Sequence, residues 1–322
     1  MNKTVKNWIK RHSSEVISYC GLLGCIIFFS IATPLSGESI WSASKLATLF
    51  ADVIVLAMIS VGAIFVYALG CMDISLGKQV GVYATIMVMV GNATGSLLLA
   101  IIICIIVTVF IGAVNGSMGE LLHIPSIIPS LVFMMVLGGV SSIVYVRYGS
   151  RNASLTAIDT RIFKSPWLMF IVLLVEVMIV TFLFNYTKLG KYAKAIGANQ
   201  TAAEQNGINI VRYKMVSYMI LGLCVVGAAV FQMGYTGTAS DSTGTGLEMK
   251  VMVALILGGM PLSGGMKSKV SCAIIGSLTY ALLDIGLPII GVPANVILMI
   301  RAIIFILIVL FTCRQKDDVL PR

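Results

Sequence analysis

Long apolar runs, separated by short polar segments, occupy most of the chain. A run of about 19 residues, wound as a helix, crosses the roughly 30 Å hydrocarbon core of a bilayer. The pattern predicts an all-α, polytopic transmembrane helical bundle that forms a single domain over residues 1–322. About ten spans are expected, near residues 16–33, 49–70, 74–91, 97–117, 126–146, 166–185, 213–234, 249–261, 269–287 and 294–313.

Two of these spans depart from the simple pattern. Span eight is short, and span three opens with the polar residues Asp73, Ser75, Lys78 and Gln79. Polar backbone at membrane depth is tolerated only where protein or a water-filled cavity surrounds it. Spans three and eight are therefore candidates for broken or re-entrant helices.

Composition agrees with a membrane protein. The chain is 58% hydrophobic and 11% charged, whereas a soluble chain has roughly 25% charged residues. Ten spans of about 20 residues leave only short tails and loops, too short for a separate soluble catalytic domain. We therefore expect a transport subunit and not an enzyme, with any ATP hydrolysis or soluble receptor function on another chain.

The excess of 22 Lys and Arg over 13 Asp and Glu gives a net charge of +9. The basic residues form short clusters between apolar runs, a pattern that orients membrane proteins and does not indicate nucleic acid binding. With both termini cytoplasmic, six basic residues lie outside and Arg301 lies within a span. The outer six are Lys45, Arg147, Arg151, Arg161, Lys164 and Lys250. The cytoplasmic side collects fifteen: Lys3, Lys6, Lys10, Arg11, Lys78, Lys188, Lys191, Lys194, Arg212, Lys214, Lys267, Lys269, Arg314, Lys316 and Arg322.

The longest polar segment on the predicted inner side runs over residues 187–214, between spans six and seven. Thr201 and Glu204 have the spacing of a capping box, in which each side chain takes a backbone amide of the first turn. Gly207 is placed to end that helix in the left-handed conformation. A helix of one to two turns is unstable alone in water, so it needs neighbours. Either a partner protein or lipid headgroups that contact the basic residues would supply them.

Three ordered stretches resemble the permease subunits of ribose-type sugar ABC importers, in the superfamily of branched-chain amino acid and ribose permeases. They are residues 70–77, residues 188–209, and residues 245–265, which include ALILGG and LSGG. The resemblance covers about residues 45–313. By this resemblance the second stretch is the cytoplasmic loop that couples to the ATPase, with candidate residues Lys188, Gly190, Lys191, Ala195, Gly197, Asn199, Ala202, Ala203, Glu204, Gly207 and Asn209. The other two stretches supply signature or gate candidates: Asp73, Ser75, Gly77, Glu248, Gly258 and Gly259.

The resemblance implies partners and a solute class. It implies an ABC ATPase subunit that binds ATP and Mg²⁺, an extracytoplasmic solute-binding protein, and a second copy of this chain or a related permease. This chain itself would bind no cofactor and no metal, and it would reside in the inner membrane of a prokaryote. The solute would be a sugar or a related polar molecule. Cys71, Lys78 and Gln79 depart from the family pattern, and residues 118–145 match weakly.

Several polar residues fall within predicted spans. Asp73 is interpreted as an N-terminal helix cap, with a role in a gate or in ion coupling as the alternative. Glu176, Asp284 and Arg301 lie at depths where an unpaired charge facing lipid costs at least about 2.5 kcal/mol. Asp284 and Arg301 are therefore expected to pair with each other or with Glu176, with a role in the substrate path as the alternative. Candidates for a translocation path are Thr108, Asn115 and Gln232.

Other functional classes remain as alternatives. The segment LSGGM at 262–266 looks like an ATPase signature, but the chain contains no GxxxxGK[ST] phosphate loop. An ion-driven secondary transporter would use Asp73, Glu176 or Asp284 as its ion site. Permeases for branched-chain amino acids or nucleosides share similar motifs, and an assembly protein without transport is a third class. The outer segment 147–165 carries four basic residues against Asp159, which suits an acidic receptor surface or anchoring to headgroups.

Overall fold

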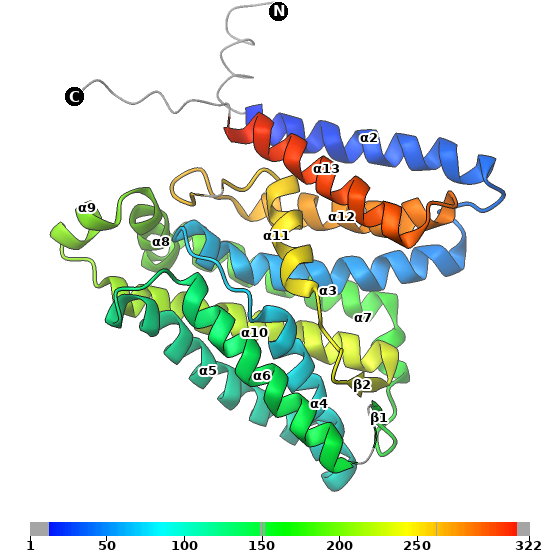
Figure 1. Cartoon of the computed structure of the whole chain (residues 1–322), viewed down its shortest axis with the longest axis horizontal. Coiled ribbons are helices and arrows are strands. Elements are labelled where there is room, and N and C mark those ends of the chain that lie inside the picture. The colour runs from blue at the N-terminus through cyan, green and yellow to red at the C-terminus, as the bar shows by residue number, and fades with distance from the viewer. Residues whose placement is uncertain (1–12, 149, 151, 262, 314–322) are drawn as a thin grey trace, which may run out of the picture.

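The structure is a computed structural model that describes residues 13–148, 150, 152–261 and 263–313. The predicted cytoplasmic clusters at 3–11 and 314–322, and Arg151 and Leu262, lie outside the described residues. Helices dominate the fold (Figure 1), and they are α2 (Ser13–Leu35), α3 (Ala43–Ala68), α4 (Leu76–Thr94), α5 (Leu97–Leu121), α6 (Ile127–Tyr148), α7 (Pro166–Tyr186), α8 (Lys188–Ala198), α9 (Gln200–Gln205), α10 (Ile210–Thr236), α11 (Leu247–Leu257), α12 (Val270–Ile289) and α13 (Ala294–Cys313). The prediction of an all-α helical bundle is confirmed.

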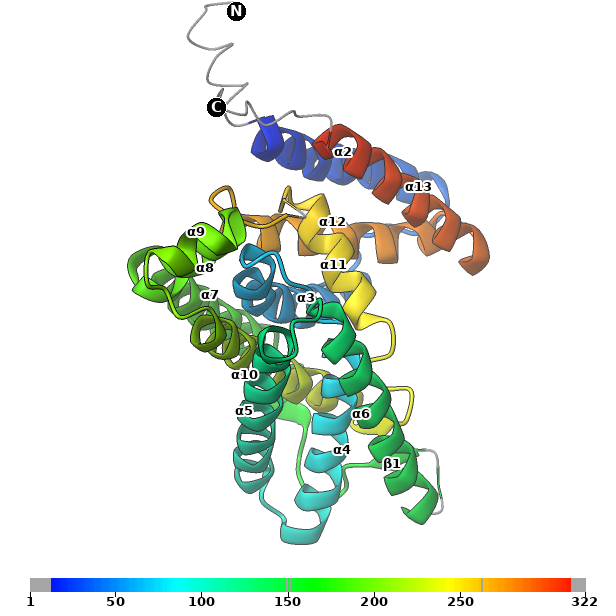
Figure 2. The same ribbon diagram turned by 60° about the vertical axis from the view of Figure 1, so that its left-hand side comes forward.

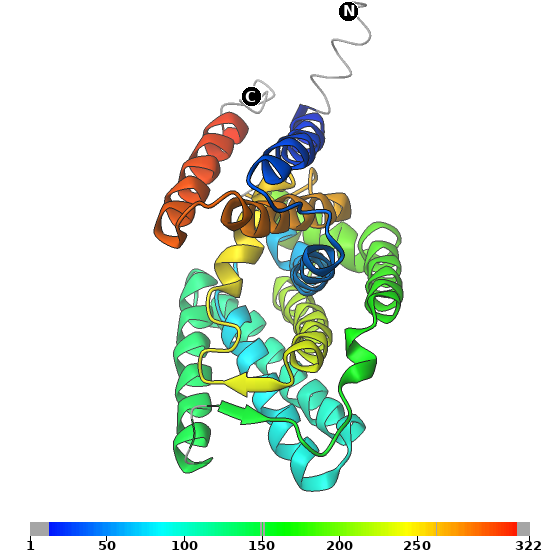
Figure 3. The ribbon, with the colours of Figure 1, turned by 90° about the vertical axis from the view of Figure 1, so that its right-hand side faces the viewer.

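Helix α3 forms the centre of the bundle. Every residue from Leu56 to Ala68 is buried, which is the pattern of a helix that neighbours cover all round. It packs against α7, α10, α11 and α12. Seen from the side, α3 and α10 lie between α6 and α7 (Figure 3).

Small residues let α10 approach its neighbours closely. A Cβ added at Gly112 or at Gly116 of α5 would lie 2.8 Å from the backbone of α10, at Met219 and Met215 respectively. On α3, a Cβ at Gly62 would lie 2.6 Å from Cys224. Close helix contact through glycine is typical of membrane bundles, where packing and not the hydrophobic effect holds helices together.

The N-terminal and C-terminal helices form an outer layer. Helix α2 packs on α12, and α13 contacts α11 and α12; both lie on the same side of the bundle, above α12 in Figure 2. The exposed side chains of α2 include Leu23, Ile27 and Ile31. This apolar surface suits contact with lipid or with another membrane chain.

Seven of the described helices are long and apolar enough to cross a membrane: α2, α3, α5, α6, α7, α10 and α12. Helix α13 is not among these seven, because the part of it with described side chains is a shorter apolar stretch, Asn295–Ile304. Helix α11 has 11 residues and rises only about 16 Å, so the prediction that span eight is short is confirmed. Non-helical residues 241–246 lead into α11, and residues 69–75 lead into α4.

A two-stranded antiparallel sheet, which the sequence did not predict, joins the segments after α6 and α10. Strand β1 (Asn152–Ser154) pairs with β2 (Thr238–Ser240), with Ala153 opposite Ala239. A 3-10 turn, η1 (Arg161–Lys164), follows. The sheet lies at the lower right in Figure 1, at the opposite end of the bundle from α8 and α9. The predicted outer segment therefore has defined structure.

Candidate functional site

The segment 187–214 contains two helices, whereas the sequence predicted one. Helix α8 was missed. Thr187 caps it, with its side-chain oxygen accepting a hydrogen bond from the Leu189 amide at 3.3 Å. Gly190, Ala193 and Ile196 are buried on one face, while Lys188 and Lys191 are exposed. This three-residue spacing of small and apolar positions was the signal available in the sequence.

Helix α8 contacts the bundle through backbone. A Cβ at Gly190 would collide with the backbone of Phe184, and one at Gly197 would collide with the carbonyl of Ala68. The Gly265 amide donates a hydrogen bond of 2.9 Å to that same carbonyl of Ala68. The C-terminal end of α3, helix α8 and the turn at 263–265 therefore meet at one point.

Gly70 connects the remaining family-like stretch to this junction. It has φ +73°, and a Cβ there would lie 3.0 Å from the Ser263 carbonyl oxygen. Only glycine takes this left-handed conformation without strain. The three stretches that resemble ribose-type permeases are thus neighbours in space as well as ordered in sequence.

Lys194 draws α8 back towards α7. Its ammonium lies 4.2 Å from the centre of the Phe184 ring and donates a hydrogen bond to Asn185 at 3.3 Å. Burial lowers the pKa of Lys194 below its ordinary value, and the charge of Lys269 lowers it further. A lysine held in this way orients α8 and is less available to lipid phosphates than the exposed Lys188 and Lys191.

The predicted capping box of the second helix is wrong. Helix α9 begins at Gln200, and its cap is Asn199, whose side-chain oxygen accepts from the Ala202 amide at 3.0 Å. Asn199 is extended because α8 ends immediately before it, so α9 restarts earlier than Thr201 allows. The prediction for Gly207 is confirmed, since it follows the helix with φ +77°.

Most of α9 is open to a partner. Thr201, Ala202, Glu204 and Gln205 are exposed, and Ala203 is its buried residue. A helix of six residues is too short to be stable alone. Its position therefore depends on the contacts at its ends.

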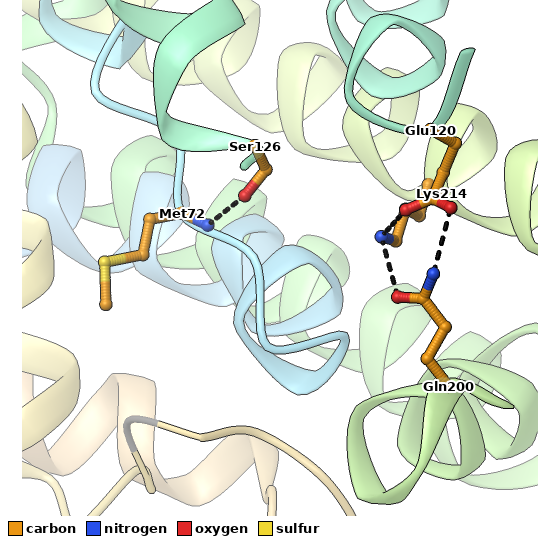
Figure 4. A network of polar contacts seen from close by, with 5 residues as sticks. All are labelled: Met72, Glu120, Ser126, Gln200 and Lys214. Atoms are coloured by element: carbon orange, nitrogen blue, oxygen red, sulfur yellow. Dashed lines mark hydrogen bonds and ion pairs between the residues drawn. The ribbon is translucent and has the colours of Figure 1, made fainter. Parts of the chain in front are cut away.

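A polar network fixes the start of α9 (Figure 4). Lys214 of α10 forms an ion pair with Glu120 of α5 and donates to the Gln200 amide oxygen at 3.2 Å. The Gln200 amide nitrogen donates to Glu120 at 2.9 Å. The Lys214 side chain is 9% exposed. Glu120 and Gln200 were not predicted, and Lys214 was predicted only as a loop cation, because the three residues are brought together by tertiary folding.

This network lines a cavity of about 310 Å³ that also includes Asn115 and Ser126. Ser126 bonds the Met72 amide at 3.4 Å (Figure 4). Neither the oxygen nor the nitrogen of the Asn115 amide has a hydrogen-bond partner, although the residue is only 2% exposed. A buried polar group of this kind needs water or a ligand.

Asp73 is 3% exposed and lies before the start of α4. Its carboxylate accepts hydrogen bonds from the Ser75 amide at 2.8 Å and the Ser75 hydroxyl at 2.6 Å. The N-cap position itself belongs to Ser75, so the prediction that Asp73 is the cap is wrong by two residues. Gln79 donates to both Asp73 (3.4 Å) and Ser75 (2.8 Å). Asp73 therefore stabilises the turn that begins the helix.

The non-helical segment 241–246 packs against the first turns of α4. A Cβ at Gly77 would collide with the Glu248 carboxylate and the Gly244 carbonyl. Lys78, predicted on the cytoplasmic side at the start of span three, donates to the Asp241 carbonyl at 3.2 Å and the Thr245 hydroxyl at 3.0 Å. At the other end of α11, a Cβ at Gly258 would collide with the backbone of Cys272, and Gly259 has φ +88°. The family-like residues here shape close backbone contacts.

The predicted pairing of Asp284 with Arg301 is confirmed, and Lys250 joins it. Asp284 forms ion pairs with Arg301 and, at 2.8 Å, with Lys250. Lys250, predicted on the outer side at the start of span eight, lies in the first turn of α11. Glu176 is not part of this cluster: it lies beside Gly227 of α10, and its Oε1 has no hydrogen-bond partner.

The three translocation-path candidates do not share one site. Thr108 packs against Gly222 of α10 and is fully buried. Asn115 faces the cavity at the α9 end, whereas Gln232 lines a different cavity near the end of α10. The three residues therefore lie in separate places within this chain and stay candidates for a translocation path.

Comparison with known proteins assigns the family. Residues 45–309 match the family described as branched-chain amino acid transport system / permease component. The chain belongs to this permease family. The matched region contains all three stretches that meet at the end of α3, so the resemblance noted from the sequence is confirmed.

Several permeases of sugar importers are similar along most of their length. Ribose import permease protein RbsC of Escherichia coli K12 is 25% identical over 97% of this chain and 96% of its own. Galactose/methyl galactoside import permease protein MglC of Salmonella typhimurium is 27% identical over 90% of each chain. L-arabinose ABC transporter permease protein AraH of Azospirillum brasilense is 26% identical over 94% of this chain and 90% of its own. No solved structure matches the chain.

Proposed function

We propose that this permease is the transmembrane subunit of an ATP-driven importer for a sugar or a related small polar solute. Its relatives are named for the import of ribose, galactose and arabinose. The chain contains no phosphate-binding loop, so a separate ATPase chain binds ATP and Mg²⁺. The solute arrives from an extracytoplasmic binding protein.

The observation that carries the proposal is the build of α8 and α9. Helix α9 exposes Thr201, Ala202 and Glu204 at one end of the bundle, while Gln200 ties it to α5 and α10. Helix α8 presses on the end of α3 through Gly197. A surface that is exposed on one side and rigidly attached on the other suits the transfer of movement from a soluble ATPase to the membrane helices.

The proposed topology has ten crossings with both termini cytoplasmic, in the inner membrane of a prokaryote. Helices α4 and α11 complete two of the crossings together with the non-helical segments before them. The β1–β2 sheet and η1 then lie outside, where Arg147, Arg161 and Lys164 meet the binding protein. Two copies of the chain, or this chain and a related permease, enclose the path, and ATP binding shifts the pair between two accessible states.

Affinity purification of the tagged chain in mild detergent, with partners identified by mass spectrometry, tests this proposal. Glu204→Lys should remove the ATPase, because Glu204 is exposed on α9 and its reversal does not disturb the core. Glu38→Lys is the matched control, since Glu38 is also exposed, at 61%, but lies at the other end of the bundle. Loss of the ATPase from both variants, or from neither, would contradict docking at α9.

Uptake separates the alternative functions. Sugar uptake that requires ATP and the binding protein supports the proposal, whereas uptake by the purified chain alone under a sodium or proton gradient would indicate a secondary transporter. The family description also names branched-chain amino acids. Uptake of leucine but not of ribose, galactose or arabinose would therefore reassign the solute within the same importer class.

A further inference from the structure

A second cavity, of about 220 Å³, lies between α3, α7, α10, α11 and α12. Its polar lining includes Asp52, Gln232, Tyr235, Lys250, Tyr280 and Asp284. A single water occupies a cavity volume of only about 15 Å³, whereas pockets for drug-sized ligands have volumes of at least about 300 Å³. The cavity therefore suits one small solute.

The charges around the cavity cancel. Lys250 and Arg301 both pair with Asp284, and Arg301 also donates to the Tyr280 hydroxyl at 3.2 Å. Asp52, Asp284 and Lys250 line the cavity, and Arg301 neutralises Asp284 from outside the lining, so the formal sum of the four groups is zero. A neutral ligand fits this balance better than an anion or a free cation does.

Two acceptors at the cavity remain unused. The Gln232 Oε1 atom is buried and receives no hydrogen bond. The Asp52 carboxylate forms no ion pair or hydrogen bond within the described part of the chain, although Lys250 is near enough to act on its charge. The Gln232 oxygen is buried, so leaving it unpaired is unfavourable, whereas Asp52 is exposed. A ligand that complements them must donate hydrogen bonds, as hydroxyl groups do.

The cavity has a neighbour towards the end of the bundle that carries the start of α3. That neighbouring cavity, of about 490 Å³, is lined by Glu38, Lys45 and Thr48 and shares Asp284. Asp284 therefore stands between the two spaces. In the proposed topology this end faces outwards, the side from which the solute arrives.

We infer that the cavity between α3, α10 and α12 binds one monosaccharide within a single chain. Sugar hydroxyls donate to Gln232 and Asp52, and the rings of Tyr235 and Tyr280 cover the apolar face of the sugar. The inference rests on the proposed function and adds to it a solute site that does not require the second subunit. Asp284, with Lys250 and Arg301, forms the polar wall of the site.

Cysteine protection tests this site in the full chain in native membranes. Thr236 lines the cavity and is exposed, so Thr236→Cys is combined with Cys20→Ser, Cys25→Ser and Cys313→Ser, and the cysteines that remain are buried. Its labelling rate with a membrane-impermeant methanethiosulfonate is measured with D-ribose, D-galactose or L-arabinose. At a concentration ten times Kd, the sugar that binds should slow labelling by about tenfold.

Two further variants show whether protection arises at the cavity. Gln232→Leu should abolish it, because the buried acceptor is lost while the volume is nearly kept. Ser217→Ala on the same helix should leave it intact, since the Ser217 hydroxyl is satisfied by the Tyr213 carbonyl at 2.8 Å. Protection that survives Gln232→Leu would overturn the inference.

Other outcomes are equally distinct. Labelling that none of the three sugars slows would overturn the inference, and slowing by sodium chloride instead would make the cavity a cation site. ATP-dependent sugar uptake, measured on the same membranes, separates the two proposals. Uptake without protection rejects this site alone, whereas absence of sugar uptake rejects the proposed function.

Discussion

The Lys214 ammonium donates a hydrogen bond of 3.2 Å to the side-chain oxygen of Gln200. This contact joins the first residue of α9 to α10, and Glu120 accepts from both partners. A charged pair from two membrane helices thus positions a six-residue helix that cannot hold its own position. Variants of Glu120 and Lys214 can therefore distinguish an effect on the stability of the bundle from an effect on coupling to the ATPase.

Breaking this pair should destabilise the chain more than removing it does. Glu120→Leu or Lys214→Met alone leaves a charge with side-chain exposure of at most 20% without its partner, which costs about 3–5 kcal/mol for a buried pair. The double variant leaves no orphan charge and should lie closer to the parent. Thermal unfolding of the purified protein in detergent measures both.

The exposed pair of Lys45 and Glu38 serves as the control for that comparison. Its atoms are 3.0 Å apart, but the side chains are 39% and 61% exposed. Lys45→Met should therefore cost no more than about 1 kcal/mol. Single variants of the inner pair that unfold no earlier than Lys45→Met would contradict the structural role of Glu120 and Lys214.

Loss of the Asn199 cap should loosen α9. Asn199→Ala removes the acceptor of the Ala202 amide, at a cost of about 1 kcal/mol, so amide exchange in residues 200–206 should accelerate about fivefold. Thr201→Ala removes no cap and should leave exchange unchanged. Hydrogen exchange with mass spectrometry distinguishes the two variants, and the opposite order would restore Thr201 as the cap.

The contact of α5 with α10 should not tolerate even a methyl group. Gly112→Ala places a Cβ 2.8 Å from the Met219 backbone, and overpacking of this kind costs about 1–3 kcal/mol. Gly24→Ala in α2 is the matched control, because no other atom lies within 4 Å of the new Cβ. Equal unfolding temperatures for the two variants would show that α5 and α10 can separate without loss.

Reversing the charges of Asp284 and Arg301 together should not restore the membrane abundance that is lost when either charge is reversed alone. Lys250 lies 2.8 Å from Asp284, so Asp284→Arg with Arg301→Asp puts two cations side by side. Adding Lys250→Glu should recover membrane abundance, since the arginine introduced at position 284 then pairs with two acidic side chains. Recovery by the double reversal alone would mean that Lys250 does not interact with Asp284.

Much of the bundle was predictable because hydropathy reports burial in lipid directly. The long spans follow from apolar runs alone, and the short apolar run at 249–261 predicted a short span eight. The path of residues 241–246 along α4 was not predictable. Charge assigned Lys78 to the cytoplasmic side and Lys250 to the outer side, but it did not indicate their distant partners, Asp241 and Asp284.

The candidate site was predictable in location but not in detail. Residues of the coupling segment, 187–214, were identified from their resemblance to ribose-type permeases. Helix α8 was missed because lysines and glycines interrupt its short apolar face. Glu120 and Lys214 are separated by 94 positions, and a single sequence contains no signal that they meet. Local rules similarly placed the cap of α9 at Thr201, because they did not include the end of α8.

The meeting of Gly197, Gly265 and Ala68 determines how stiff the coupling segment is. At this point peptide backbones touch without side chains between them: the Gly265 amide bonds the Ala68 carbonyl at 2.9 Å, and Gly197 leaves no room for a methyl group. Side chains yield by changing rotamer, whereas close-packed backbone transmits strain. If α8 moves by one helical rise, about 1.5 Å, the end of α3 must therefore move with it by nearly the same distance.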